Sequence, residues 1–205
     1  MKRIPGRTVE RLIVYRRVLG GQADAGLESV FSHELAALAH VSAVQVRRDL
    51  MEAGFSGSPS RGYDVKELLE RVDRILDAPE GIKAALVGVG NMGRALLSYF
   101  SGRNQKISVV AAFDSDQSKV GRVIAGCRCY PVTSITDKAR QLGITLGIIA
   151  VPGPQAQLTA DALLEAGVTG ILNFAPVPLK ARAGVFVEQV DIMRAIEKVA
   201  HFAKQ

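Results

Sequence analysis

The stretch Ala84-Ala-Leu-Val-Gly88-Val-Gly90-Asn-Met-Gly93 decides the fold of the longer part of this chain. An apolar run leads into the pattern Gly-x-Gly-x-x-Gly, and the segment that follows, residues 94–99, has a helical composition. A strand, a glycine turn and a helix in this order form the phosphate-binding turn of a dinucleotide fold. The glycines permit the tight turn, the approach of a pyrophosphate and the packing of helix on strand, and the helix start offers free N–H groups. We therefore expect the phosphates to lie against Gly88, Gly90, Asn91, Met92 and Gly93.

An acidic residue follows at the spacing that this fold requires. Asp114 ends the next apolar run, Val109-Val-Ala-Ala-Phe-Asp114, 21 residues after Gly93. An acid there accepts hydrogen bonds from the adenosine ribose and repels a 2′-phosphate. No arginine follows immediately, so the sequence favours NAD(H) over NADP(H). The alternative is a glycine-rich turn that holds no ligand.

The rest of this part of the chain alternates apolar runs with helical segments. The runs cover residues 84–87, 109–113, 147–151 and 170–174, and the helical segments cover residues 92–101, 134–142 and 155–166. Continuous apolar runs between helices are typical of a parallel sheet that is covered on both faces. The pattern predicts an α/β fold of the Rossmann type.

The first 80 residues have a different pattern of apolar residues. Helical periodicity covers residues 8–19, and Gly20-Gly21 directly after them should end the helix. Two more helices should begin at the caps Ser32 and Ser42. A turn-rich segment, residues 54–63, precedes a fourth helix capped by Asp64. Three small helices, a turn-rich hairpin and a fourth helix predict a winged helix-turn-helix. Residues 77–81 read as a linker, which gives domains 1–80 and 81–190 and a C-terminal helix in 191–205.

Length and composition exclude several classes of protein. The chain has 205 residues, 48% of them hydrophobic, which is too short for a dehydrogenase that carries a separate substrate domain. No run approaches the roughly 18 apolar residues of a membrane span. The N-terminus lacks the apolar region of a secretory signal, and two cysteines are too few for a disulfide framework. We expect a cytoplasmic protein without a membrane partner.

Net charge is a weaker guide than size. The chain carries +6, but residues 1–82 contain 12 basic and 12 acidic residues, whereas residues 83–205 contain 14 and 8. Bulk charge therefore does not identify a DNA-binding end, and a local patch must do so.

The dinucleotide domain lacks an obvious catalytic group. None of His33, His40 and His201 ends a strand of the sheet, and neither Tyr99 nor Tyr130 belongs to a Tyr-x-x-x-Lys pair. A dehydrogenase needs a positioned acid or base, so the sequence favours sensing over catalysis.

Two other functions stay open: a small NAD-dependent oxidoreductase with a helical dimerisation domain, and a CoA- or nucleotide-binding module. We expect no metal site. Cys127-Arg-Cys129 reads as a turn between two short strands rather than as a thiol sensor.

Several motifs along nearly the whole chain resemble the Rex family of redox-sensing transcriptional repressors. The most specific are Gln45-Val-Arg-Arg-Asp-Leu50 and Ile171-Leu-Asn-Phe-Ala-Pro176, accompanied by the glycine turn and by Val151-Pro-Gly-Pro-Gln-Ala-Gln157. The resemblance implies a homodimer that binds a palindromic operator in double-stranded DNA, is released by NADH with weak competition from NAD⁺, and exchanges a C-terminal helix, here about residues 192–204, between subunits.

The resemblance also implies roles for individual residues. The walls around the nicotinamide would be Val151, Pro152, Asn173, Ala175 and Pro176, and the residues that couple ligand state to subunit geometry would be Tyr99, Asp191 and Arg16. The DNA contacts would be Ser42, Gln45, Arg47 and Arg48 in the recognition helix and Arg61 in the wing. Arginine and glutamine can read guanine and adenine edges, although at least one basic residue should contact phosphate instead.

The sequence departs from the family pattern at two places in this surface. Val44 stands where an aromatic residue is usual in the recognition helix, and the wing has Pro59 where an arginine is usual, with Arg61 two residues later. Both departures bear on operator preference rather than on DNA binding itself.

Overall fold

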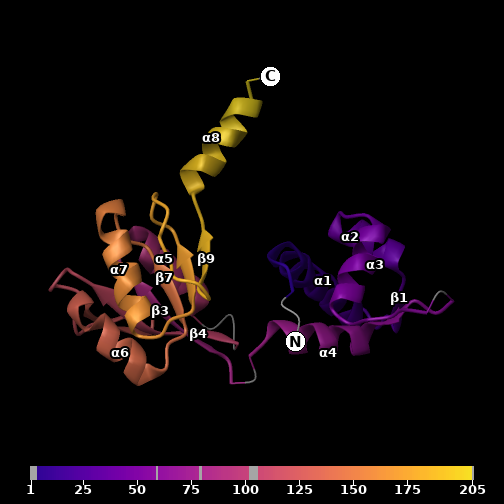
Figure 1. The fold of residues 1–205 in the computed structure, drawn as a ribbon, viewed down its shortest axis with the longest axis horizontal. Helices are drawn as coiled ribbons and strands as arrows, with labels where there is room; N and C mark the ends of the chain where they lie inside the picture. The colour runs from indigo at the N-terminus through magenta and orange to yellow at the C-terminus, as the bar shows by residue number, and fades with distance from the viewer. Residues whose placement is uncertain (1–3, 59, 79, 102–105, 205) are drawn as a thin grey trace. The chain divides into compact units, whose positions relative to one another are not determined.

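The structure is a computed structural model of the chain, and it describes residues 4–58, 60–78, 80–101 and 106–204. The contacts within the chain define two compact units, residues 1–79 and 80–205 (Figure 1). Pro59, the departing position in the predicted wing, lies outside the described residues.

The first unit consists of helices with a short antiparallel sheet. Its elements are α1 (Gly6–Asp24), β1 (Ser29–Val30), α2 (Ser32–Ala39), α3 (Ala43–Glu52), β2 (Tyr63–Asp64) and α4 (Val65–Leu76). As predicted, Ser42 caps α3 by accepting a hydrogen bond from the Gln45 N–H at 3.1 Å, and Asp64 caps α4 through the Glu67 N–H at 2.8 Å. A short turn between α2 and α3 includes His40 in the left-handed conformation, at φ 54°.

Two of the predicted helix boundaries in this unit are wrong. Helix α1 runs through Gly20-Gly21 to Asp24, because a glycine costs a helix only about 1 kcal/mol relative to alanine, and burial of Leu19 continues to hold the helix against the core. Helix α2 is capped at Phe31 rather than at Ser32, since the Glu34 carboxylate accepts the Phe31 N–H at 2.7 Å. The Ser32 hydroxyl instead accepts a hydrogen bond from Arg47.

All four helices of this unit contribute side chains to one apolar core. Its buried residues come from α1 (Leu12, Tyr15, Leu19), α2 (Leu35, Ala36), α3 (Val46, Leu50) and α4 (Val65, Leu68, Val72). The stripe predicted on α4 is thus the face that the helix buries. Because this core is separate from the core of the second unit, the helical unit has its own source of stability.

The second unit is a seven-stranded sheet with the strand order β5-β6-β4-β3-β7-β8-β9. The strands are β3 (Ile82–Val87), β4 (Ile107–Asp114), β5 (Val123–Ile124), β6 (Cys127–Pro131), β7 (Leu146–Ile149), β8 (Gly170–Asn173) and β9 (Phe186–Gln189). Every pairing is parallel except that of β5 with β6. The helical segments are α5 (Asn91–Phe100), η1 (Val132–Ser134), α6 (Ile135–Leu142), α7 (Gly153–Glu165) and α8 (Ile192–Phe202).

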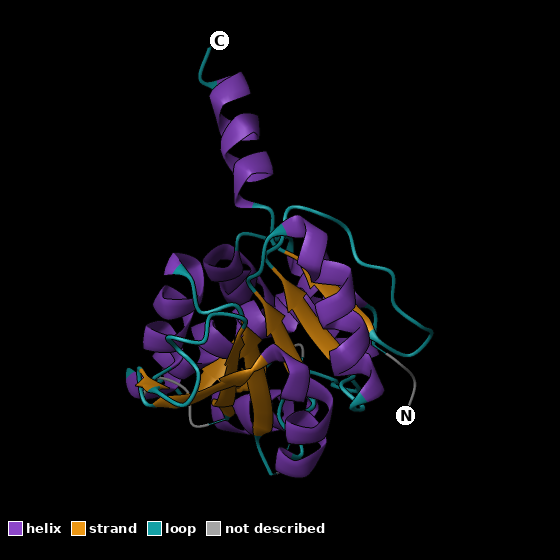
Figure 2. Ribbon diagram, turned by 90° about the vertical axis from the view of Figure 1, so that its left-hand side faces the viewer, coloured by secondary structure: helices purple, strands orange, loops and turns teal. Residues whose placement is uncertain are grey.

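Helices cover both faces of this sheet, which confirms the prediction from the apolar runs (Figure 2). Strand β3 demonstrates the reason, since Ala85 and Val87 join the core under α6 and α7 while Ala84 and Leu86 join the core under α5. Successive side chains of a strand point to opposite faces, so a strand buried on both faces is apolar throughout.

The prediction that Cys127 and Cys129 form a turn between two strands is wrong. Both Cys127 and Cys129 lie within strand β6 and are buried as free thiols on the face of the sheet that α5 covers. Burial, with a smaller contribution from Cys129, raises the pKa of Cys127 to about 11. A thiol with that pKa stays protonated at neutral pH and is a poor nucleophile.

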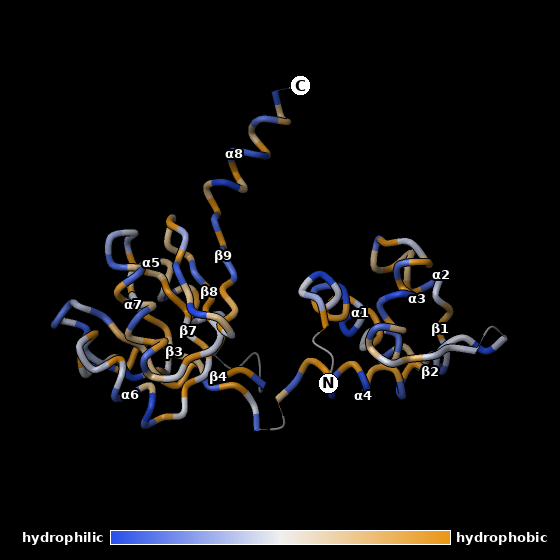
Figure 3. Tube along the Cα trace, in the orientation of Figure 1, coloured by the Kyte–Doolittle hydropathy of each residue, from blue (hydrophilic) through white to orange (hydrophobic). Residues whose placement is uncertain are grey.

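Helix α8 has no buried side chain, and it stands clear of the sheet (Figure 2). Short hydrophobic and hydrophilic stretches alternate along it (Figure 3), and its exposed apolar side chains are Ile192, Met193, Ile196, Val199 and Phe202. A helix with one apolar face normally buries that face.

Candidate functional site

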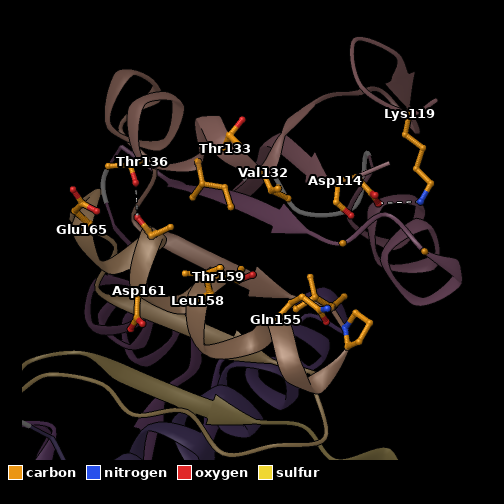
Figure 4. A pocket seen from close by; sticks show the side chains of 18 residues that line it. Asp114, Lys119, Val132, Thr133, Thr136, Gln155, Leu158, Thr159, Asp161 and Glu165 are labelled. Carbon is orange, nitrogen blue, oxygen red and sulfur yellow. Dashed lines mark hydrogen bonds and ion pairs between the residues drawn. The ribbon is translucent and has the colours of Figure 1, made fainter. Parts of the chain in front are cut away.

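A cavity of about 650 Å³ opens at the carboxyl ends of the parallel strands (Figure 4). From β3 the chain builds β4, β5 and β6 on one side and then crosses to β7 on the other side, so the strand order reverses between β3 and β7. Ligands of open α/β sheets bind at such a reversal. The predicted site residues that line the cavity are Gly88, Gly90, Asp114, Val151 and Pro152.

The glycine turn is built so that only glycine fits at two of its positions. Gly88 has φ +94°, and a Cβ added there would lie 2.5 Å from the Ala150 carbonyl oxygen. A Cβ on Gly93 would collide with the Gly88 carbonyl oxygen, which fixes how closely α5 approaches β3. At Gly90, by contrast, an added Cβ would meet open space, so the backbone there is accessible from the cavity side.

The start of α5 can receive an anion. Gly90 is the N-cap and supplies no side-chain hydrogen bond, and the first amide bonded within the helix is that of Arg94, to the Gly90 carbonyl at 2.9 Å. The preceding N–H groups, those of Asn91, Met92 and Gly93, carry the positive end of the helix dipole. These features fit a bound pyrophosphate.

Asp114 lies at the end of β4 and is 7% exposed. Its Oδ2 accepts the Val89 N–H at 2.7 Å, and its Oδ1 accepts the Asp116 N–H at 2.9 Å. Burial tends to raise the pKa of Asp114, but these hydrogen bonds and Lys119 outweigh burial and hold the pKa below its ordinary value. The carboxylate is therefore ionised at neutral pH, as an acceptor for ribose hydroxyls must be.

Sequence reasoning missed Lys119, which also lines the cavity. Its ammonium lies 3.0 Å from Asp114 Oδ2 and 3.5 Å from Asp116 Oδ2. A turn held by the Lys119 N–H to the Asp116 carbonyl, at 3.0 Å, returns the lysine toward β4. A lysine five residues after the acid has no signature in the Gly-x-Gly-x-x-Gly pattern, so only the fold reveals the pairing.

Sequence reasoning also missed the side walls of the cavity. They are supplied by η1 with α6 and by α7, and the residues on these segments are Val132, Thr133, Ile135, Thr136, Gln155, Leu158, Thr159, Asp161, Ala162 and Glu165. Their signal in the sequence was weak, because a wall residue on a helix face follows the same periodicity as a core residue.

Asn173, Ala175 and Pro176, predicted as nicotinamide walls, are not among the residues that line the cavity. Asn173 is buried and holds the turn after β8: its amide nitrogen donates to the Val177 carbonyl at 2.8 Å and to Gln189 Oε1 at 2.7 Å. Its Oδ1 accepts the Ala175 N–H at 3.0 Å. In the structure Asn173 therefore holds the turn after β8 rather than lining the cavity.

We expect Asn173→Ala to lower the free energy of unfolding by about 2–4 kcal/mol, because it leaves several buried polar groups without partners. Urea denaturation followed by circular dichroism measures this change. Gln157→Ala is the matched control, since the Gln157 amide also bonds Asp161 and Lys180 but in an exposed place. Equal losses in the two variants would contradict the structural role of Asn173.

The outer surface of α3 is basic and partly apolar. Arg47 and Arg48 are exposed, as are Val44 (67%) and Met51 (70%). Arg47 donates to the Ser32 hydroxyl at 3.0 Å, which holds its guanidinium near the start of α2. Arg61 is exposed in the loop between α3 and β2, where Ser58 and Gly62 form a bridge across the loop. The three arginines predicted to contact DNA, Arg47, Arg48 and Arg61, are thus accessible.

Gln45 lies closer to the core than predicted. Its side-chain amide nitrogen donates to Asp49 Oδ1 at 2.8 Å. Asp49, which sequence reasoning did not select, is buried and also accepts two hydrogen bonds from Arg11, at 2.6 and 2.7 Å, and one from the Tyr15 hydroxyl at 2.8 Å. The helical spacing did contain a signal for the burial of Asp49, since Asp49 lies three residues after the buried Val46 on the same face of α3.

Hydrogen bonding controls the charge of Asp49. Burial would raise the pKa of Asp49, but hydrogen bonds from Arg11, Tyr15 and Gln45 hold it below the ordinary value. The carboxylate is therefore ionised and fixes α3 against α1.

The three residues expected to couple ligand state to subunit geometry lie on different elements. Arg16 of α1 forms ion pairs with Asp77 at 2.8 Å and Asp73 at 3.6 Å. Tyr99, near the end of α5, is 58% exposed, and its ring packs edge-on against Phe100. Asp191 caps α8 by accepting the Arg194 N–H at 2.9 Å.

The described ranges contain neither a candidate metal site nor a candidate membrane span. No group of three or more His, Cys, Asp and Glu side chains there could hold a metal ion. Nor does any helix in those ranges have the length and hydrophobicity of a membrane span.

Two family models match different parts of the chain. The model "Putative DNA-binding protein N-terminus" matches residues 3–50, and the model "CoA binding domain" matches residues 80–177. The chain therefore combines an N-terminal DNA-binding type of unit with a Rossmann-like unit.

Relatives match over nearly the whole length of the chain. Redox-sensing transcriptional repressor Rex 2 of Enterococcus faecalis is 36% identical over 201 residues, which cover 98% of this chain and 94% of that protein. Rex of Lactobacillus gasseri is 38% identical over 200 residues, with the same coverage.

Solved structures of one relative match equally widely. RSP, a Rex-family repressor, is 28% identical over 99% of this chain. Its complex with β-NAD⁺ and operator DNA has a TM-score of 0.91 and 94% of its chain covered, and its complex with β-NADH has a TM-score of 0.84 and 95% covered. With the sequence identities above, these matches establish that this chain belongs to the Rex family of redox-sensing transcriptional repressors.

Proposed function

We propose that this chain is an NADH-responsive repressor that binds a palindromic operator as a homodimer and leaves it when NADH binds. The observation that carries the proposal is the cavity at the strand reversal, where the glycine turn, the start of α5 and Asp114 meet. The structures of RSP with NAD⁺ and operator DNA and with NADH support the same pair of ligands for this chain.

In the dinucleotide site each residue has a distinct task. The N–H groups of Asn91, Met92 and Gly93 bind the pyrophosphate, while Gly88 and Gly90 keep side chains out of its way. Asp114 accepts hydrogen bonds from the hydroxyls of the adenosine ribose. Val151 and Pro152, which line the cavity, contact the nicotinamide, and Asn173 fixes the turn that includes Ala175.

In the first unit we assign a winged helix-turn-helix. Helices α2 and α3 with their short turn form the helix-turn-helix, and the loop between α3 and β2 is the wing. Arg47 and Arg48 on α3, near the Ser42 cap, face the major groove, with Gln45 held beside them by Asp49. Arg61 in the wing contacts the backbone or the minor groove. Basic side chains that bind phosphate position the protein, and those that reach base edges specify the sequence.

The apolar face of α8 supports a homodimer. Its exposed side chains need a covering surface, and an exchange of residues 191–205 between subunits, with domains 1–80 and 81–190 in each, would provide one. Two recognition helices related by a two-fold axis should lie about 34–36 Å apart, or a multiple of that distance. Tyr99, Asp191 and Arg16 then couple the ligand state to the geometry of the dimer.

Coupling of this kind is reciprocal. A ligand can shift the dimer only by its different affinities for the DNA-competent and incompetent states. If NADH weakens operator binding by some factor, operator DNA weakens NADH binding by the same factor. Catalysis plays no part in this scheme, because Rex proteins are transcriptional repressors and not enzymes. We expect the protein to act in the cytoplasm.

A fluorescence-anisotropy titration of a labelled palindromic operator tests the proposal. We expect specific binding that weakens at least tenfold with saturating NADH, and binding to a single half-site that is much weaker than to the palindrome. Parallel titrations with NAD⁺ and CoA examine the alternative of a CoA-binding module, which the CoA-binding family model raises. Absence of operator binding in every ligand state would remove the repressor assignment.

A further inference from the structure

Asp114 has little free hydrogen-bonding capacity in this structure. An ionised carboxylate offers about four lone-pair sites. Three are already directed at hydrogen-bond donors, since Oδ2 faces the Val89 N–H and the Lys119 ammonium and Oδ1 faces the Asp116 N–H. The carboxylate can therefore accept one ribose hydroxyl without breaking a bond, and a second only by displacing one of these donors.

Lys119 can supply the missing contact. Its ammonium carries three N–H donors, and its contacts with Asp114 and Asp116 occupy two of them. The side chain is one-fifth exposed, lines the same cavity as Asp114 and extends toward the Asp114 carboxylate (Figure 4). The remaining N–H can donate to the oxygen of a vicinal ribose hydroxyl.

We propose that Asp114 and Lys119 read the adenosine ribose as a pair, Asp114 accepting from one hydroxyl and Lys119 donating to the other, and that Lys119 limits how strongly the site rejects a 2′-phosphate. This inference rests on the proposed NAD(H) site and adds a specificity-determining residue to it. Selection against NADP(H) is then a balance between two opposite charges rather than a property of Asp114 alone.

The local charge determines whether each substitution strengthens or weakens the binding of a 2′-phosphate. Asp114, Asp116 and Lys119 together carry one negative charge, which disfavours a phosphate at the 2′ position. Asp114→Ser removes one negative charge and releases Lys119 from its shorter ion pair, so the ammonium can face a phosphate. Lys119→Met removes the positive charge and leaves the two carboxylates to repel it.

The test is a set of fluorescence titrations with NADH and NADPH on the full chain. From wild type to Asp114→Ser, NADH affinity should fall about tenfold or more, as expected for the loss of a hydrogen bond to a charged group, and NADPH affinity should rise. Lys119→Met should weaken NADH binding by about three- to tenfold, which corresponds to the net contribution of an ordinary hydrogen bond, and should weaken NADPH binding further. In the double variant the NADPH gain of Asp114→Ser should disappear.

Lys83→Met is the matched control, because Lys83 is an exposed lysine at the opposite end of β3 from the cavity. It should leave both affinities unchanged, and thermal unfolding should establish that every variant is folded. Unchanged NADH binding in a folded Lys119→Met variant, or an NADPH gain that persists in the double variant, would overturn the role of Lys119. A wild-type chain that binds no NADH would instead overturn the proposed site and this inference with it.

Discussion

Replacing Asp49 by alanine should lower the free energy of unfolding of the helical unit by about 3–5 kcal/mol, the range for removal of one partner from a buried ion pair. Asp49 accepts four hydrogen bonds from three side chains, and the substitution leaves Arg11, Tyr15 and Gln45 without their acceptor. Tyr15 is buried, so its hydroxyl gains no water in exchange. Urea denaturation measures the loss, and hydrogen exchange should localise it to α1 and α3.

Glu52→Ala serves as the control for this prediction. Glu52 lies on the same helix and accepts a hydrogen bond from the Thr8 hydroxyl at 3.0 Å, but it is exposed. Glu52→Ala should therefore lower the free energy of unfolding by less than about 1 kcal/mol. A change of that size in Asp49→Ala as well would refute the claim that the buried carboxylate joins α3 to α1.

The Asp49 carboxylate also gives this unit a predictable pH dependence. Its pKa is lower in the folded state than the ordinary 3.8, so the unfolded chain binds more protons near that pH. The stability that Asp49 contributes is complete above the unfolded pKa and is lost as pH falls through the folded value. Wild type should therefore lose more stability below about pH 4 than Asp49→Asn does, because the asparagine does not titrate.

Replacing Gly93 by alanine should weaken NADH binding by about a hundredfold or more and leave a repressor that NADH does not release, since losing two hydrogen bonds to a charged phosphate, at about 1.5 kcal/mol or more each, corresponds to that factor. The added Cβ would meet the Gly88 carbonyl oxygen, so α5 must move away from β3 and carry its first N–H groups with it. Operator binding should persist, because the helical unit has its own core. NADH titration and operator anisotropy measure the two effects.

Gly170→Ala is the control for the glycine turn. An added Cβ at Gly170 would make only an ordinary contact, at 3.4 Å from the Leu146 side chain. That variant should bind NADH and release operator as wild type does. If Gly93→Ala responds to NADH normally, the packing of α5 on β3 does not set the position of the phosphate site.

Much of the fold could be predicted because its signals are local. The glycine pattern between β3 and α5, the caps Ser42 and Asp64, and the apolar strand runs depend on residues near one another in the chain. The errors fall where packing outweighs a local preference: Gly20-Gly21 lies within α1, and Cys127 and Cys129 lie in a strand. In both cases burial of neighbouring side chains outweighed a weak turn or helix-ending preference.

Some residues of the candidate site could likewise be located from the sequence, and others only from the structure. Sequence spacing located Gly88, Gly90 and Asp114, because the strand and helix that carry them adjoin in the chain. It did not locate Lys119 as a partner of Asp114, or Asn173 as the support of a turn, because those roles depend on where a side chain returns after a loop.

By itself, then, the sequence determined that this protein has a helical unit, a Rossmann-type fold with an acid at the end of β4, and the motifs of the Rex family. Only the tertiary structure decided that Lys119 returns to Asp114, that Asp49 binds Arg11, Tyr15 and Gln45, and that Asn173 faces inward. Periodicity and motif spacing report on contacts within a few residues along the chain. A charged or polar side chain, by contrast, finds its partner through packing of segments distant in sequence, and that packing exists only in the folded protein.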